Sequence, residues 1–296
     1  MINIAKSSFK IPDIEAKLKL GAPGIEIQLL NRDIDGCLKP NFSIPTDFKS
    51  SPIVAVHAPL LTNYQGVDFL NCDIETVLGA EMFEKTCIFA RKLSDFYGRK
   101  ISVICHMELP LTVQEQVGIY DKTFETLRNM AESFPEIDIN LENTTQRMYG
   151  VYDNVKLVKE INLPNVGTTF DVCHALISEY TTGLLTNNGA FKRGLDQTYE
   201  YMPLSTGLEL NEDVCKWVHL NNATESEIGY GCGTGHGAPF DPRNEKDIEF
   251  LKILIAKIKT FKNKADVCIE VREDDYLNCI NYAKTKAAFE LAYKKQ

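Results

Sequence analysis

Short apolar runs alternate with longer amphipathic segments along most of the chain. Eight runs have the length and composition of buried strands, at residues 2–5, 24–30, 53–57, 101–106, 137–142, 167–171, 215–220 and 267–272. Segments with helical periodicity lie between them, at about 12–20, 74–97, 113–134, 154–161, 245–260 and 277–294. Residues 31–51 and 177–210 lack either pattern, and we expect them to be irregular. The alternation indicates repeated βα units around a parallel sheet.

Eight strands and their helices occupy the whole chain, so neither a second domain nor a linker is needed. The length of 296 residues is normal for one barrel of eight such units. We therefore predict an α/β fold, a single (β/α)8 TIM barrel that forms one domain over residues 1–296. The active site of such a barrel lies at the C-terminal ends of its strands.

The composition is that of an ordinary soluble globular protein, with 44% hydrophobic and 25% charged residues. A net charge of −9 argues against a broadly basic nucleic-acid surface, although it is compatible with a local basic groove. Nine cysteines without a C-x-x-C pair indicate buried free thiols in a reducing cytosol. The N-terminus has no signal-peptide core, and no apolar run approaches the ~18 residues of a membrane span. We expect a cytoplasmic protein that does not bind membranes.

All five histidines lie at predicted strand ends or in a glycine-rich loop, and none lies on a predicted helix. His57, His106 and His219 each lie at the end of a predicted strand. His174 follows Asp171 by three residues, and His236 lies in the glycine-rich loop. One such histidine is usually structural, and an Asp-x-x-His segment is often a capped turn. The ordered set, which also has glutamates at two strand ends, instead predicts a metal site. Mixed carboxylate and imidazole ligands suit zinc, manganese, cobalt or iron better than calcium.

The same residues carry a resemblance to a known superfamily. In chain order the motifs are His57-Ala58-Pro59-Leu60, Cys105-His106, Leu141-Glu142-Asn143-Thr144, Asp171-Val172-Cys173-His174-Ala175, Val218-His219-Leu220-Asn221, Gly235-His236-Gly237 and Ile269-Glu270. Together they resemble the xylose isomerase-like TIM barrel superfamily. This superfamily includes sugar-phosphate isomerases and epimerases, and also the apurinic endonucleases of the endonuclease IV type. The resemblance covers residues from about Gly24 to Glu270.

The isomerase branch implies one divalent ion, zinc, manganese or cobalt, bound by four residues. The matching positions here are Glu142, Asp171, His219 and Glu270. In this branch the two glutamates exchange a proton with a sugar or sugar phosphate through a metal-stabilised enediolate, and His174 binds a substrate hydroxyl. This metal-dependent isomerase or epimerase is the function that we predict. Its partner is a small-molecule sugar or sugar phosphate.

The endonuclease branch is the alternative, and it implies a zinc phosphodiesterase acting on abasic DNA. There His57, His106, His174 and His236 become further ligands of a multinuclear zinc site. The chain departs from that pattern at Thr234, where the endonucleases have an aspartate, and the neighbouring carboxylate is Asp241. A third interpretation, a barrel that only binds its ligand, is disfavoured because no residue of the four-ligand set is missing.

Further substrate contacts are predicted around the same face. With one metal ion, His57, His106 and His236 are candidates for binding the sugar. Glu26 lies on the inner face of the second strand, and Arg272 follows Glu270 by two residues, where it could meet a phosphate or form a salt bridge at the rim. Barrels of this kind often pair as homo-oligomers, but no stretch of the sequence marks an interface.

Overall fold

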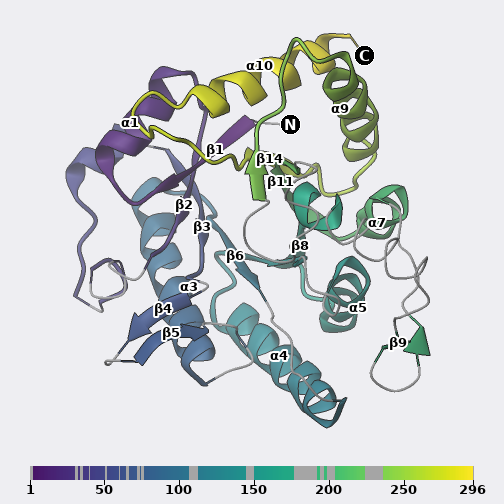
Figure 1. The fold of residues 1–296 in the computed structure, drawn as a ribbon. Helices are drawn as coiled ribbons and strands as arrows, with labels where there is room; N and C mark the ends of the chain where they lie inside the picture. Colours follow the sequence, from purple (N-terminus) through teal and green to yellow (C-terminus); the bar gives the residue numbers. More distant parts are fainter. Residues whose placement is uncertain are drawn as a thin grey trace.

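Eight parallel strands close into a barrel at the centre of the computed structural model, as Figure 1 shows. The structure describes residues 3–30, 33, 36–39, 41–50, 52–59, 61–64, 67–71, 74, 77–106, 113–144, 150–176, 192–193, 197–198, 204–223 and 236–295. In the order in which they pair, the strands are β1 (Asn3–Ser8), β14 (Asp266–Ile269), β11 (Cys215–Leu220), β8 (Val166–Asp171), β7 (Asp138–Glu142), β6 (Ser102–His106), β3 (Ile53–His57) and β2 (Ile25–Gln28). Since β2 pairs with β1, the ring is closed, and the predicted (β/α)8 barrel is confirmed.

Helices cover the outside of the ring and connect successive strands. They are α1 (Ile11–Lys19), α3 (Val77–Tyr97), α4 (Val113–Ser133), α5 (Val151–Ile161), α7 (Leu204–Asn211), α9 (Glu245–Ile258) and α10 (Ile280–Lys294). Figure 1 shows the yellow α10 crossing above the barrel next to α9, close to the N-terminus. Pairing of β1 with β14 joins the two ends of the chain within one sheet.

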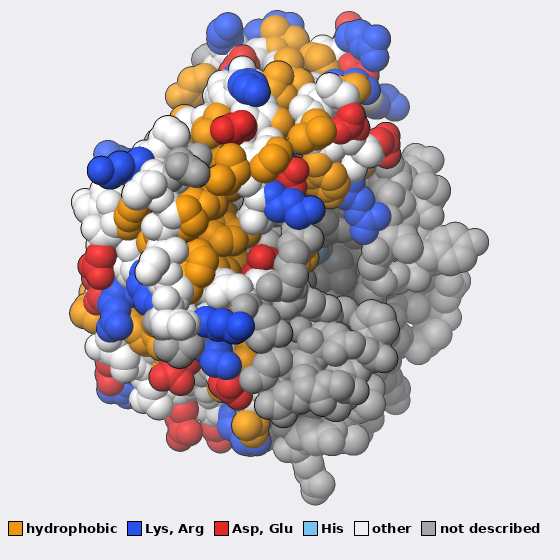
Figure 2. Space-filling view, turned by 90° about the vertical axis from the view of Figure 1, so that its left-hand side faces the viewer, with side chains coloured by type: hydrophobic (Ala, Val, Ile, Leu, Met, Phe, Trp, Pro, Cys, Tyr) orange, Lys and Arg blue, Asp and Glu red, His pale blue; other side chains and the backbone are white. Residues whose placement is uncertain are grey.

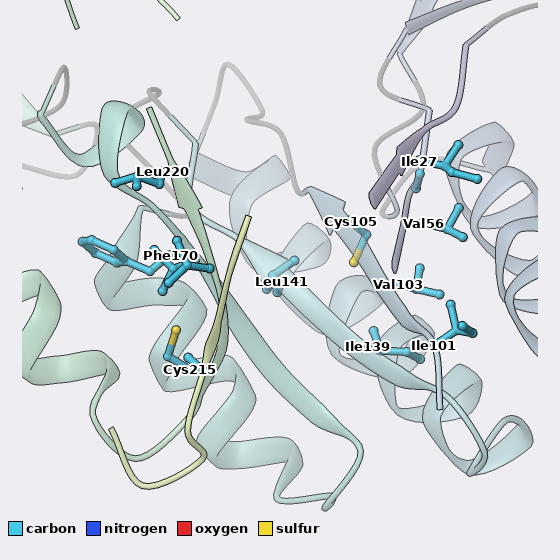
Figure 3. Packing of buried hydrophobic residues seen from close by; sticks show 14 of the residues in the cluster. Ile27, Val56, Ile101, Val103, Cys105, Ile139, Leu141, Phe170, Cys215 and Leu220 are labelled. Carbon is cyan, nitrogen blue, oxygen red and sulfur yellow. The ribbon is translucent and has the colours of Figure 1, made fainter. Parts of the chain in front are cut away.

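Two hydrophobic clusters follow from the two-residue period of the strands. The larger cluster contains alternate strand residues such as Val56, Val103 and Ile139, which Figure 3 shows among the strands and helices. A separate small cluster contains strand residues that neighbour members of the larger cluster in sequence and therefore point to the other side of the strand. Its members are Ile4, Ala55, Ile104, Trp217 and Cys268. We infer that the large cluster fills the layer between barrel and helices and that the small one fills the barrel interior. Each fully buried aliphatic side chain contributes roughly 1.5–3 kcal/mol to folding.

The polar layer of the barrel lies directly above this interior cluster. A residue two positions further along a strand points to the same side, so each interior residue has a successor one layer nearer the C-terminal ends. Ile4 is followed in this way by Lys6, Ala55 by His57, and Trp217 by His219. The apolar interior therefore forms a floor, and the polar residues form the layer at the mouth of the barrel.

The structure differs from the predicted elements in several places. A hairpin of β4 (Leu61–Tyr64) and β5 (Val67–Asn71) stands where a loop was expected after the third strand, and the 3-10 helix η1 (Thr46–Ser50) lies in the segment 31–51. The first strand continues to Ser8 instead of ending at Ala5, and the last ends at Ile269 rather than Arg272. Two short strand pairs, β9 (Lys192–Arg193) with β10 (Gln197–Thr198) and β12 (Asn222–Ala223) with β13 (His236–Ala238), also form.

The expectation of irregular structure throughout 177–210 was wrong at its C-terminal end, where α7 begins at Leu204. Gly207 in this helix lies against Phe170, because a side chain built there would approach that ring to 3.3 Å. Asn211 at its end bonds Thr168 of β8. Tertiary packing against the barrel thus stabilises a helix that contains a glycine, which is a weak helix former. The rest of the segment lies largely outside the described residues.

The cysteines that the structure describes lie in the interior of this fold. Seven of the nine cysteines lie in the described ranges, and all seven are free and buried, as predicted for them. Among the helices that the structure describes, none has the length and apolar character needed to cross a membrane.

Figure 2 shows a band of hydrophobic side chains on one face, with charged groups along its borders. Exposed large hydrophobic residues include Leu20, Tyr276, Leu277 and Ile280.

A buried cap at the end of α4 gives a test of the fold. The side-chain amide nitrogen of Asn165, Nδ2, donates to the backbone carbonyls of Ala131 and Phe134, at 2.9 and 3.3 Å. We expect Asn165→Ala to lower the free energy of unfolding by about 1–3 kcal/mol, because two buried carbonyls lose their donor. The control is Asn263→Ala, which removes an exposed bond to the carbonyl of Asp213 and should change stability by less than about 0.5 kcal/mol. Equal effects of the two variants in urea unfolding would contradict this account.

Candidate metal centre

Four predicted ligands converge on one point at the mouth of the barrel. The Nδ1 atom of His219 lies 2.8 Å from Oε2 of Glu270, 3.1 Å from Oε1 of Glu142 and 3.8 Å from Oδ2 of Asp171. One ligand atom from each of the four residues lies within 4.8 Å of every other. The residues come from β7, β8, β11 and the position after β14, so the closure of the barrel brings them together.

Asp171 is held in a defined orientation by its neighbours. Its backbone N–H donates to Oδ1 of Asn143 at 2.8 Å, and the amide of Asn143 donates back to its carbonyl. One carboxylate oxygen, Oδ1, accepts the backbone N–H of His174 and so caps the helical turn at 172–176. The other, Oδ2, accepts the amide of Asn221 and faces His219. The capped turn and the candidate ligand are therefore both present, one on each oxygen.

His219 is oriented by Glu26 from below. The Nε2 atom of His219 lies 2.9 Å from Oε2 of Glu26, which also accepts the indole N–H of Trp217 at 2.6 Å. Neither Glu26 nor His219 has exposed surface. When Nε2–H donates to a carboxylate, the lone pair of a neutral imidazole lies on Nδ1, which here points at the other candidate ligands. The predicted inner-face position of Glu26 agrees with this contact, whereas its bonds to Trp217 and His219 were not predicted.

A second group of ligand atoms shares Glu142. Oε2 of this carboxylate lies 3.1 Å from Nε2 of His57 and 2.8 Å from Nε2 of His106, and the two nitrogens are 3.2 Å apart. Nδ1 of His57 lies 2.8 Å from the carbonyl of Ala58, to which it must donate. In the neutral ring the lone pair is therefore on Nε2, toward His106 and Glu142. These three residues also form a set that could hold a metal ion.

His174 lies beside both groups. Its Nδ1 donates to the carbonyl of Asn143 at 2.7 Å and lies 3.5 Å from Oε1 of Glu142. Its ring meets that of His106 edge to face, with the centroids 6.0 Å apart. The predicted strand-end residues thus form one continuous cluster that includes His174.

The end of the glycine-rich segment contacts the chain two residues after Glu270. Strand β13 starts at His236, whose side chain lies outside the described part, as does Thr234. The carbonyl of Gly237 accepts the backbone N–H of Arg272, and a Cβ at this glycine would lie 2.9 Å from that nitrogen. With φ at +99°, position 237 favours glycine for both reasons. The carboxylate of Asp241 is bonded by the guanidinium of Arg243 at 2.8 and 3.1 Å.

Lys6 also lies in this cluster, although it was not among the residues predicted from the sequence. The ammonium of Lys6 lies 2.5 Å from Oε1 of Glu270 and 3.6 Å from Oε1 of Glu26. The predicted first strand ended at Ala5, one residue too early to place this lysine in the barrel. The available signal was the alternation of Ile4 and Lys6 on the same side of one strand.

The carboxylates and histidines shift each other's pKa values. Burial alone would raise the pKa of Glu142, but the charges of His106 and His219 hold it well below 4.5. Burial disfavours charge on His219, yet Glu142, Glu26 and Glu270 together raise its pKa well above 6.5. The pKa of His57 is lowered, by burial and then by Lys6. The carboxylate of Glu142 is thus anionic at neutral pH.

The donor set fits a divalent cation. Glu26, Glu142, Asp171 and Glu270 place four carboxylates in one buried cluster, and Lys6 is the permanent cation bonded to it within the described residues. Anions in a buried cluster need compensating charge. Three carboxylate oxygens and one imidazole nitrogen that converge on a single gap are suitable ligands for zinc, manganese or cobalt.

No protein family model matches the chain, and no curated protein matches its sequence. Several solved structures match along their full length. A D-tagatose 3-epimerase-like protein is 18% identical with a TM-score of 0.57, and the match covers 100% of this chain and 99% of that chain. An L-ribulose 3-epimerase is 15% identical with a TM-score of 0.59 and coverage of 99% and 96%. A probable 3-DHS dehydratase from Bacillus anthracis is 12% identical with a TM-score of 0.55 and coverage of 99% and 100%.

These matches define the fold. Other structures that match include a xylose isomerase domain protein from Planctomyces limnophilus. The chain therefore has the fold of the xylose isomerase-like TIM barrel proteins, as its strand-end motifs predicted. Its structural neighbours include sugar epimerases and isomerases.

The pKa shifts predict how the stability of the metal-free protein depends on pH. The raised pKa of His219 contributes stability that is present below pH 6.5 and is lost as the pH rises through the folded-state pKa. The lowered pKa of Glu142 contributes stability that is present above pH 4.5 and is lost in more acidic solution. Urea unfolding of metal-free protein should therefore show maximal stability between these two values.

The control is His219→Asn, which should flatten the decline above pH 6.5. Saturating zinc should also remove that decline, because a metal ion replaces the proton on Nδ1. A wild-type protein whose stability rises steadily from pH 6.5 to 9 without metal would contradict the assignment.

Proposed function

We propose that the protein is a metal-dependent isomerase or epimerase of a sugar or sugar phosphate. The observation that carries this proposal is the convergence of Glu142, Asp171 and Glu270 on Nδ1 of His219 at the barrel mouth. The printed names of the structural neighbours, sugar 3-epimerases among them, support the same chemistry. A zinc, manganese or cobalt ion at this point would act as a Lewis acid on adjacent substrate oxygens.

The two glutamates are the candidate acid and base. They come from β7 and from the end of β14, which are not neighbours in the barrel. The side chain of Glu270 is 14% exposed, so it reaches the mouth, whereas that of Glu142 is 1% exposed. Oε2 of Glu142 contacts His106, which lies nearer the surface and shares its proton. Removal of a proton by one group and its return by the other would pass through an enediolate of the sugar.

Histidines at the rim are the candidate groups for binding the sugar. His174 and His106 are only slightly exposed and flank the shared carboxylate of Glu142. We assign His174 to a substrate hydroxyl, with His57 and His106 completing that wall. The backbone N–H of Arg272 donates to the carbonyl of Gly237, next to His236 in the chain. We assign Arg272 and His236 to a phosphate group of the substrate, which would there meet a cation. Glu26, with no exposed surface, orients His219 and does not contact the sugar.

Conservative replacement of either glutamate tests this assignment. Glu142→Gln and Glu270→Gln should each lower kcat by at least about 10²-fold, because the amide cannot accept the transferred proton. The assay is exchange of the substrate carbon-bound hydrogen in D2O, followed by NMR over a panel of ketoses and ketose phosphates. Glu290→Gln, which changes an exposed salt bridge to Lys286, is the matched control. Full turnover by both site variants would rule out the two-carboxylate mechanism.

A second candidate function is hydrolysis of a phosphodiester in abasic DNA. The observation that favours it is the triangle of His57, His106 and Glu142, whose ligand atoms lie 2.8–3.2 Å apart. Such spacing suits three ligands on one face of a zinc ion. In this alternative His174 and His236 would be ligands as well. Two features of the sequence argue against this function. The net charge is −9, and Thr234 stands where the endonucleases have an aspartate.

Elemental analysis of protein purified without chelator distinguishes the two functions. We expect one ion per chain, and we expect His106→Ala to leave that content unchanged, because His106 is outside the four-ligand set. Two or three zinc ions per chain, reduced in His106→Ala, would instead favour the multinuclear site. Chelator-sensitive cleavage of a duplex with an abasic site would then establish the alternative.

A further inference from the structure

Lys6 is a buried cation in the layer of candidate ligands, and the reaction outlined above does not use it. It faces Glu26 in the register of β1 with β2, and the pairing of Ala5 with Ile269 places Glu270 beside it. Its side chain is only 11% exposed. Burial disfavours its charge, but Glu270 and then Glu26 raise its pKa, so the ammonium is retained.

The bond from Lys6 makes the two oxygens of Glu270 different. Oε1 accepts the ammonium of Lys6 at 2.5 Å, whereas Oε2 faces Nδ1 of His219 at 2.8 Å. A carboxylate that binds a metal through both oxygens must turn both toward the ion. The contact with Lys6 opposes that rotation, and Glu26 holds the ammonium from its other side.

We propose that Lys6 is a positioning residue that makes Glu270 a ligand through Oε2 alone. This inference rests on the proposed metal centre, although not on the identity of the sugar. A glutamate that used both oxygens would occupy an additional coordination position. Catalytic metal sites keep such positions open for substrate. Lys6 thereby keeps room on the ion for the oxygens of the substrate.

A merely structural salt bridge and a positioning residue predict different effects of removing the charge. If Lys6 only stabilised the barrel, Lys6→Met would weaken metal binding or leave the coordination unchanged. If it positions Glu270, the freed carboxylate should rotate onto the ion. Removal of a nearby positive charge also strengthens the attraction between the site and a cation. Lys6→Met should therefore bind metal at least as tightly as the wild type, with one more oxygen ligand.

Cobalt(II) is the probe, because its visible absorption weakens and shifts as its coordination number rises. We expect Lys6→Met to have an unchanged or lower Kd for cobalt in chelator competition, together with a weaker, shifted visible band. Its kcat should fall although the metal is bound. Lys6→Arg, which keeps a charged donor to Oε1, should restore the wild-type spectrum.

The matched control is Lys216→Met at the opposite end of the barrel. Lys216 is also a partly buried lysine, bonded to Asp138 at 3.1 Å, and its removal should alter neither spectrum nor Kd. If Lys6→Met does not fold, Lys6→Leu provides the same comparison, again without a donor to Oε1 of Glu270. An unchanged cobalt spectrum in the folded variant would overturn the inference. So would a Kd raised by about tenfold or more, the usual effect of losing a metal-orienting contact.

The outcomes also separate this inference from the proposed function. Wild-type protein that binds cobalt but turns over no ketose would remove the isomerase assignment, while the spectra would still decide the role of Lys6. Wild-type protein that binds no cobalt would overturn the metal centre and the role of Lys6 together.

Discussion

The constraint on which the upper barrel depends is the burial of several carboxylates around one imidazole. Glu142, Glu270 and Asp171 converge on His219, and Glu26 supports the same ring from below. Carboxylates this close repel one another unless N–H donors and cations compensate. The protein supplies the backbone N–H of His174, the amide of Asn221, the indole of Trp217 and the ammonium of Lys6. These contacts fix carboxylate orientations that would otherwise spread apart, and they leave one gap whose charge favours a cation.

The barrel tolerates this polar layer because the layer beneath it is apolar. The strand period places Ile4, Ala55 and Ile104 directly below Lys6, His57 and His106. Glu142, Asp171 and His219 are buried, so electrostatic interactions among them are stronger than on the surface. Hydrophobic burial around the barrel offsets the desolvation of the ligands. A rigid floor also fixes the height of each ligand, since strands joined into a closed ring cannot slide independently.

Most of this arrangement could be predicted from the sequence, because strand ends with His or acidic residues are recognisable by alternation. His57, His106, Glu142, Asp171 and His219 all lie at the expected strand ends. What the sequence did not reveal depends on contacts between distant strands. The bond of Trp217 to Glu26 joins β11 to β2, and Lys6 was missed because the end of β1 is set by its pairing with β2. Likewise α7 forms because Gly207 fits against Phe170, which local propensity does not encode.

The shared carboxylate of Glu142 connects the candidate metal centre to the proposed proton-transfer chemistry. Its Oε1 faces His219, while its Oε2 contacts His57 and His106. Because Nδ1 of His57 is committed to the carbonyl of Ala58, a proton on Nε2 of His106 is the one available to bond both Nε2 of His57 and Oε2 of Glu142. That proton is adjacent to the carboxylate of a candidate base. A group that holds one exchangeable proton beside a cation site is better suited to moving hydrogen on a sugar than to activating water on a phosphodiester. The position of this exchangeable proton beside the candidate cation site is the physical reason for preferring the proposed isomerase or epimerase.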